Sequence, residues 1–251
     1  MPKRKAETEV EGKIVASKVK RESKPVSRLG IEDITVYSSP AIAKRKNHQI
    51  TVSENREPIP SRNKDNQLVF RDYPNFRPNL SPKEVIQAGS FGGTYFRPIY
   101  SSITGKSYDD VWKEFPGDWF DGVNIKKYVT SSKYLTAVNT YKADCGQGLE
   151  EWERSGWITE IDPYGWFQWY CRFYLGRRCS DDERQLSRGM GVMGPKGRWR
   201  NNLINKCLSN NAPLEDALNN YAISPKVRQL LQHWAYRLTL KDLQSALKKK
   251  K

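Results

Sequence analysis

The stretch from Tyr164 to Arg200 combines aromatic, arginine-rich and glycine-rich segments whose chemistry suits an anionic ligand. Between residues 172 and 200, eight lysines and arginines stand against three acids. Glycine lets the backbone approach a ligand closely, and arginine supplies forked, permanently charged donors that suit phosphate. We therefore predict that the basic side chains of this stretch contact phosphate groups. They are Arg172, Arg177, Arg178, Arg184, Arg188, Lys196, Arg198 and Arg200.

Arg172 lies within the aromatic run, where the rings cover one broad face of an expected helix. A face of that kind predicts burial in the core, with few rings left to stack on bases. A guanidinium in such surroundings needs an acceptor, because an unpaired buried charge is costly. The acceptor is either a bound anion or an internal carboxylate, and the sequence leaves both open.

Two glycine-rich segments are candidates for backbone cradles. Residues 189–198 are expected to form a basic hairpin between two helices, similar to the turn with which helix-hairpin-helix modules hold a phosphate. Gly189 to Gly194 match G-x-G-x-x-G, but a helix rather than a strand should precede them, so a dinucleotide site is excluded. For the second segment, 89–93, a helix C-cap with a tight turn is favoured over a second cradle.

The residues that suggest catalysis are few. Asp118 and Asp121 flank Trp119 and Phe120 and are candidates for acid–base chemistry. Cys179 follows two arginines and precedes an expected helix start, conditions that lower a thiol pKa. No base stands near it in the sequence, and His233 is expected to be a packed or a surface residue of a helix.

The sequence contains no pattern that indicates a metal site, a cofactor site or a membrane-spanning segment. The four cysteines, at 145, 171, 179 and 207, and the two histidines, at 48 and 233, do not give the local spacing of a zinc site. We expect free thiols, no metal and no cofactor. No apolar segment is long enough to span a bilayer, and the N-terminus lacks a secretory signal, so a membrane partner is not expected.

The positive charge is concentrated at the two ends of the chain. Of a net charge of +15, residues 1–80 contribute 17 basic and 10 acidic side chains, and the last four residues are all lysine. The central body, 81–247, holds 22 basic and 18 acidic residues. Basic tails add salt-sensitive affinity for polyanions without specifying a site.

Residues 1–78 are expected to be a disordered or extended tail, because their composition cannot bury enough surface to offset the entropy of ordering. Two basic clusters near the N-terminus have the spacing of a bipartite nuclear import signal. Their residues are Lys3, Arg4 and Lys5, then Lys18, Lys20 and Arg21. They predict an import receptor as partner and a nuclear location. The apolar positions between 68 and 76 are expected to dock along the domain surface.

The body, residues 79–247, is expected to be a single, mainly α-helical domain of about 8–9 helices, followed by a lysine tail at 248–251. N-cap residues followed by proline or by an acid at the third position predict helix starts near 82, 108, 163, 181 and 225. Apolar spacing predicts further helices over 134–141, 203–208, 214–221 and 227–238. The segment 94–103 alone reads as strand-like.

These features together favour a nuclear protein that binds nucleic acid, with DNA expected rather than RNA. An enzyme that acts on bases or nucleotides through an aromatic pocket, in the manner of a glycosylase or hydrolase, remains an alternative. A protein-interaction scaffold is the second alternative.

Overall fold

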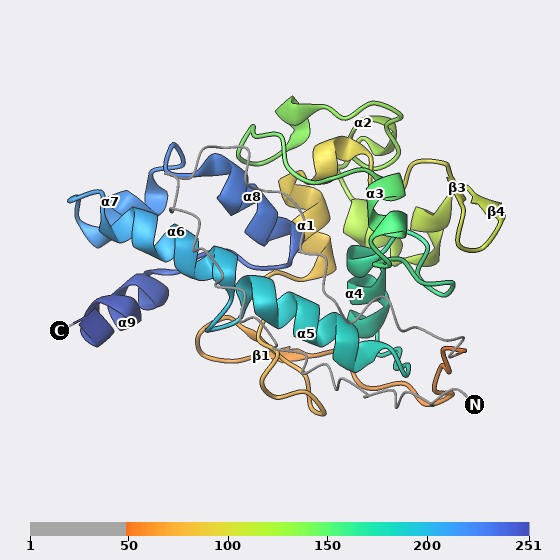
Figure 1. The fold of residues 1–251 in the computed structure, drawn as a ribbon, viewed down its shortest axis with the longest axis horizontal. Helices are drawn as coiled ribbons and strands as arrows, with labels where there is room; N and C mark the ends of the chain where they lie inside the picture. Colours follow the sequence, from red (N-terminus) through yellow and green to blue (C-terminus); the bar gives the residue numbers. More distant parts are fainter. Residues whose placement is uncertain (1–48, 251) are drawn as a thin grey trace, which may run out of the picture. The chain divides into compact units, whose positions relative to one another are not determined.

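The computed structural model describes residues 49–250, so the basic clusters at 3–5 and 18–21 lie outside the described residues. Its helices are α1 Pro82–Ala88, α2 Ile125–Tyr128, α3 Leu149–Arg154, α4 Trp166–Tyr174, α5 Asp182–Met193, α6 Arg198–Leu208, α7 Leu214–Asn219, α8 Pro225–His233 and α9 Leu240–Lys250. Two antiparallel hairpins complete it: β1 Ser61–Arg62 with β2 Leu68–Val69, and β3 Ile99–Ser101 with β4 Lys106–Tyr108. The expected mainly α-helical fold is confirmed (Figure 1).

Helix α1 begins where its capping residues predict. Ser81 and Glu84 form a capping box, in which the Ser81 hydroxyl accepts from the Glu84 N–H and Glu84 accepts from the Ser81 N–H at 2.6 Å. Pro82 occupies the first helical position, where its missing N–H costs no hydrogen bond. Helices α5 and α8 begin within one residue of the expected starts at 181 and 225.

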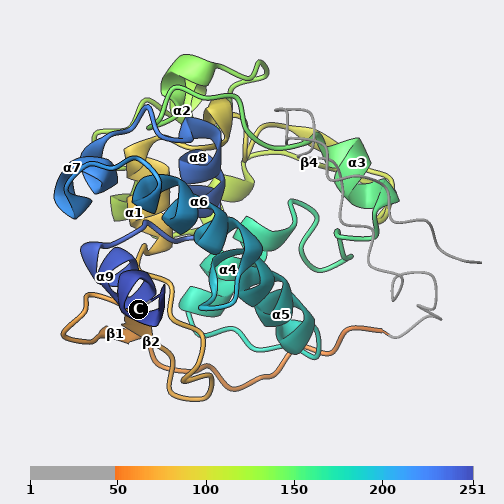
Figure 2. The same cartoon turned by 60° about the vertical axis from the view of Figure 1, so that its left-hand side comes forward.

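Helix α4 forms the centre of the core, as its aromatic face predicts. Trp169, Tyr170 and Phe173 are fully buried, and the Tyr170 ring stacks on Trp166 with centroids 5.3 Å apart. Figures 1 and 2 show α4 enclosed by α1 and α5, with α6 and α8 farther along the body. The buried rings explain how a chain this polar holds a well-packed interior.

Residues 49–78 belong to the folded body, so the expected domain boundary at residue 78 is wrong for the described chain. Leu68, Phe70 and Phe76 are at most 2% exposed and pack in the same core as α4. The Phe70 and Phe173 ring centroids lie 4.9 Å apart. Long-range packing therefore supplies the apolar contacts that this polar segment lacks locally.

Local start signals fail at three places in the body. The start expected at 108 gives instead the end of β4 and a short 3-10 helix, Val111–Glu114. The helix expected over 134–141 is reduced to a 3-10 turn, Thr136–Val138. Helix α4 begins at Trp166 rather than 163, because Gly165 adopts φ +84° immediately before it.

The C-terminal segment also differs from the helix that its apolar periodicity predicts. The helix expected over 227–238 ends at His233, where Ala235 turns at φ +57°, and Tyr236 N–H donates back to the Leu231 carbonyl at 2.9 Å. A separate helix, α9, then runs to Lys250 and includes most of the expected lysine tail. Helix α9 packs against α6 and α7.

Candidate functional site

Five of the eight expected phosphate ligands are paired with carboxylates of the protein. The pairs are Arg172 with Glu114 and Asp162, Arg177 with Asp162, Arg178 with Asp72, Arg184 with Asp181, and Arg200 with Asp242. Most of these carboxylates come from segments remote in sequence. Folding therefore gives five of the eight expected phosphate ligands internal carboxylate partners.

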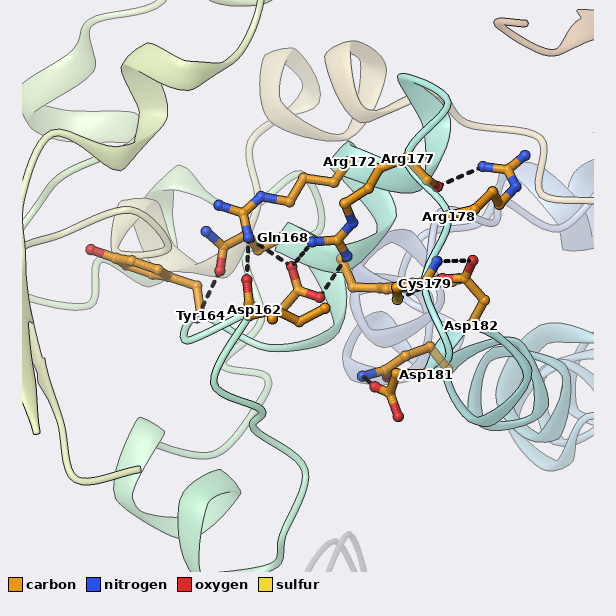
Figure 3. Close-up of polar contacts among 12 residues, drawn as sticks. Asp162, Tyr164, Gln168, Arg172, Arg177, Arg178, Cys179, Asp181 and Asp182 are labelled. Atoms are coloured by element: carbon orange, nitrogen blue, oxygen red, sulfur yellow. Dashed lines mark hydrogen bonds and ion pairs between the residues drawn. The ribbon is translucent and has the colours of Figure 1, made fainter. Parts of the chain in front are cut away.

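Asp162 is the centre of the largest of these clusters, shown in Figure 3. Its carboxylate is fully buried and accepts from Arg172 Nη1 at 3.0 Å and from Arg177 Nη1 and Nη2 at 2.8 and 2.6 Å. Arg172 also donates to both Glu114 oxygens, at 2.7 and 2.6 Å. Burial by itself lowers the pKa of Arg172, but the hydrogen bonds to Glu114 and the charge of Asp162 outweigh it and raise that pKa. The acceptor that the sequence left open is thus an internal pair of carboxylates.

Arg178 and Arg200 each tie two distant segments together. Arg178 donates to Asp72 at 2.7 and 3.1 Å, and its guanidinium carbon lies 3.8 Å from the centroid of the Phe173 ring. Arg200 donates to Asp242 at 2.5 Å and so joins α6 to α9. These arginines stabilise the fold through charge pairing and ring contact rather than facing a ligand.

The remaining three basic residues differ in exposure, because Arg188 is half-buried and the other two are exposed. Arg188 lies over aromatic rings, 5.2 Å from the centroid of Trp157 and 5.6 Å from that of Trp234. Lys196 and Arg198 are exposed at the junction of α5 and α6. Of the expected ligands, these two are the ones that folding leaves on an open surface.

The junction between α5 and α6 is tighter than the hairpin expected over 189–198. Helix α5 continues through Met193, and Gly197 N–H donates to the Gly194 carbonyl at 2.8 Å to close a short turn. Gly189 is inside the helix, where an added Cβ would lie 3.2 Å from the Trp166 ring, so it is a packing position rather than a cap. In Figure 1 the two helices follow each other almost in line, unlike the helices of a helix-hairpin-helix module.

Helix α6 extends the basic surface beyond the residues expected from sequence. Asn205 and Lys206 are exposed two turns after Arg198, and the first turn of α6 contains no acid. The sequence signal for this basic surface is the lack of acidic residues, since residues 184–214 contain no Asp or Glu. Glycines and arginines indicate residues 172–200, so Lys206 is not among the expected ligands.

The expected acid–base pair does not form a site. Asp118 pairs with Lys83 at 2.8 Å on the surface, and Asp121 is an exposed residue that ends the 3-10 helix Gly117–Phe120. Trp119 and Phe120 between them are buried in the core. Neither carboxylate lines either of two cavities, one beside Phe91 and Phe167 and the other beside Cys179.

Cys179 lines the larger of these cavities, an open depression of about 290 Å³ together with Arg178, Asp182, Asp72 and Tyr73. Its thiol donates to Asp182 at 3.1 Å. Burial and the negative charge of Asp182 raise the pKa of Cys179 to about 12. The expected lowering of this pKa is therefore wrong, because burial and the Asp182 carboxylate outweigh the charge of Arg177.

Cys179 should consequently react slowly with an alkylating agent. At pH 8 its thiolate population is far below that of a free cysteine, and the greater nucleophilicity of a basic thiolate only partly compensates. We expect iodoacetamide to modify Cys179 about ten- to a hundredfold more slowly than the same peptide in the urea-unfolded chain. Mass spectrometry of the tryptic peptide measures both rates, and equal rates would contradict the buried pairing.

The glycine-rich segment 89–93 is a structural turn, as its favoured interpretation predicts. Gly89 caps α1 at φ +88°, and an added Cβ there would meet the Val138 carbonyl at 2.1 Å. Helix α8 holds the turn: Gln232 donates to the Gly89 carbonyl at 3.0 Å, and His233 Nε2 accepts the Phe91 N–H at 2.9 Å. The turn is thus occupied by protein groups and offers no cradle.

Comparison with known proteins gives no further guide: no family model, curated protein or solved structure matches the chain. Within residues 49–250, no group of three or more His, Cys, Asp or Glu side chains is arranged to bind a metal ion. None of the described helices is both long and apolar enough to cross a membrane.

Proposed function

We propose that the protein binds nucleic acid, DNA in preference to RNA, through phosphate contacts from the α5–α6 junction and the exposed side of α6. The observation that carries this proposal is the charge of residues 184–214, which include six lysines and arginines and no acid. Asp181 and Asp242 neutralise two of the six, Arg184 and Arg200. Of the other four, Lys196, Arg198 and Lys206 are exposed.

The local geometry supports an anionic ligand there. The first N–H groups of a helix lack intrahelical partners and carry partial positive charge, and no acid in the first turn of α6 opposes an approaching phosphate. Lys196 immediately precedes this turn and Arg198 is its first residue. Asn205, on the same exposed side, can donate to or accept from sugar and base edges.

Delivery to the nucleus belongs to the same proposal. The clusters at Lys3–Lys5 and Lys18–Arg21 would be read by an import receptor and would add nonspecific attraction to a polyanion. The surface on α6 would then supply the positioned contacts.

Replacing Lys196 and Arg198 together by alanine is expected to weaken binding of a labelled DNA duplex by the full-length protein. Because each lost phosphate contact removes about one unit of salt dependence, the slope of log affinity against log salt should flatten by about two. Fluorescence anisotropy over a salt series measures it. The matched control, Lys64→Ala with Lys106→Ala, makes the same charge change on the two β-hairpins and should leave the α6 contribution intact. Equal slopes for the two double variants would exclude the α6 surface.

A further inference from the structure

A second basic surface lies over the 89–93 turn. Residues 122–143 contain four lysines and no acid, and they lead from α2 through an exposed segment to the 3-10 turn Thr136–Val138. Lys126, Lys127 and Lys133 are all exposed. Helix α8 separates this surface from the one on α6. It packs against α6, and it also hydrogen-bonds to the 89–93 turn beneath this surface.

Tyr134 lies within this surface and has an unusual combination of exposure and restraint. It is 38% exposed and is one of the large apolar residues that the described chain leaves exposed to solvent. A Cβ added to Gly92 would lie 2.5–2.6 Å from three carbons of the Tyr134 ring, which places the glycine over one face of that ring.

The Tyr134 hydroxyl fixes the other end of the side chain. It accepts from Asn139 Nδ2 at 2.7 Å and from the Cys145 N–H at 3.0 Å, and it donates to the Cys145 carbonyl at 3.0 Å. Asn139 is fully buried and also accepts the Gly92 N–H at 2.8 Å. The ring is therefore held before any ligand arrives, and little side-chain entropy would be lost on binding.

The backbone beside the ring is held in the same way. Leu135 N–H donates to the Gly92 carbonyl and Ser131 N–H to the Gly93 carbonyl, both at 2.9 Å. Gly93 has φ +80° and admits no side chain, because a Cβ would meet the Lys127 carbonyl at 2.1 Å. The turn rejected above as a cradle thus serves as the base on which this exposed segment is built.

We propose that Tyr134 is a stacking platform for an unpaired nucleobase and that Lys126, Lys127 and Lys133 contact the adjoining phosphates, so that this surface binds single-stranded nucleic acid. Aromatic rings beside a basic path are the recurrent means of binding single strands without sequence preference. A base inside a duplex has no free face to offer. The proposal rests on the proposed function in assuming a nucleic-acid partner, and it adds a surface specific for unpaired strands.

The test measures binding of full-length protein to labelled oligo(dT) of about 20 nucleotides, a length that exceeds one single-strand site, and to a duplex of the same length. Tyr134→Leu is expected to weaken oligo(dT) binding about tenfold and to change duplex binding less than twofold. Tyr134→Phe keeps the ring and should retain most of the affinity. The matched control is Tyr100→Leu, since Tyr100 is 64% exposed on the β3–β4 hairpin, away from this surface.

A measurement on the unaltered protein guards against a variant that fails to fold. Oligo(dT) carrying 5-iododeoxyuridine should crosslink to Tyr134 on irradiation, as identified by mass spectrometry, and adducts confined to α6 would overturn the proposal.

Equal effects of Tyr134→Leu and Tyr100→Leu on binding, or equal losses of affinity for duplex and single strand, would also overturn it. Competition by polyglutamate as strong as that by unlabelled oligo(dT) would indicate an acidic protein instead. The Lys196→Ala, Arg198→Ala variant tests the proposed function of the α6 surface separately, because its expected effect is on duplex binding alone.

Discussion

Replacing Asp162 by asparagine is expected to lower the free energy of unfolding by about 3–5 kcal/mol, the typical cost of removing one partner from a buried ion pair. Asparagine keeps the shape of the side chain but removes the charge that two guanidinium groups share. Arg172 retains Glu114, whereas Arg177, whose side chain is 10% exposed, has Asp162 as its only carboxylate partner within residues 49–250. The substitution therefore leaves a buried, uncompensated charge. Urea unfolding followed by circular dichroism measures the change.

The matched control for this prediction is Asp118→Asn. Asp118 also pairs with a basic residue, Lys83, but the two side chains are 58% and 39% exposed. Exposed pairs of this kind contribute at most about 1 kcal/mol. A loss of similar size in both variants would show that the Asp162 cluster is not the stabilising element described above. Restoring part of the stability by adding Arg177→Met to Asp162→Asn would support it.

Acidification should destabilise the protein through His233. Burial lowers the pKa of His233 to about 3, whereas an unfolded chain holds its histidine near the ordinary value. The folded state therefore keeps a neutral imidazole while the unfolded state takes up a proton. Stability from this group is complete above about pH 6.5 and declines as the pH falls from there toward 3, by about 1.4 kcal/mol per pH unit.

His233→Gln isolates this contribution because glutamine does not titrate and its carbonyl can accept the Phe91 N–H that His233 Nε2 accepts at 2.9 Å. The variant loses the ring stacked on Phe91, with centroids 4.0 Å apart, and should be less stable at pH 7. Between pH 6.5 and 4, however, its free energy of unfolding should decline less steeply than that of the unaltered protein. Urea titrations at several pH values give both curves, and parallel curves would contradict the neutral, buried imidazole.

Local sequence signals were sufficient wherever a helix is set by its own residues. Ser81 and Glu84 complete their capping box within one turn, and the aromatic face of α4 is buried as its spacing predicts. The same logic failed at 134–141, where Tyr134 and Asn139 hydrogen-bond to other loops instead of continuing a helix. Side-chain partners from distant segments override local propensity there.

The candidate site shows the same division. Sequence alone placed Lys196 and Arg198 inside the predicted basic stretch, and both are exposed in the structure. It could not tell these residues from Arg178 and Arg200, whose carboxylate partners stand 106 and 42 positions away. Whether an arginine of this stretch pairs with a distant carboxylate is decided by the fold.

The amino-acid sequence by itself determined the mainly helical class, the burial of the aromatic run and the uneven distribution of positive charge, since each depends on composition or on spacing within a few turns. Tertiary structure alone decided which arginines pair with carboxylates, that Leu68, Phe70 and Phe76 belong to the core, and that Tyr134 is held in place at the surface. Those outcomes are set by long-range contacts, in which the energy of a charge or a ring depends on what folding places beside it.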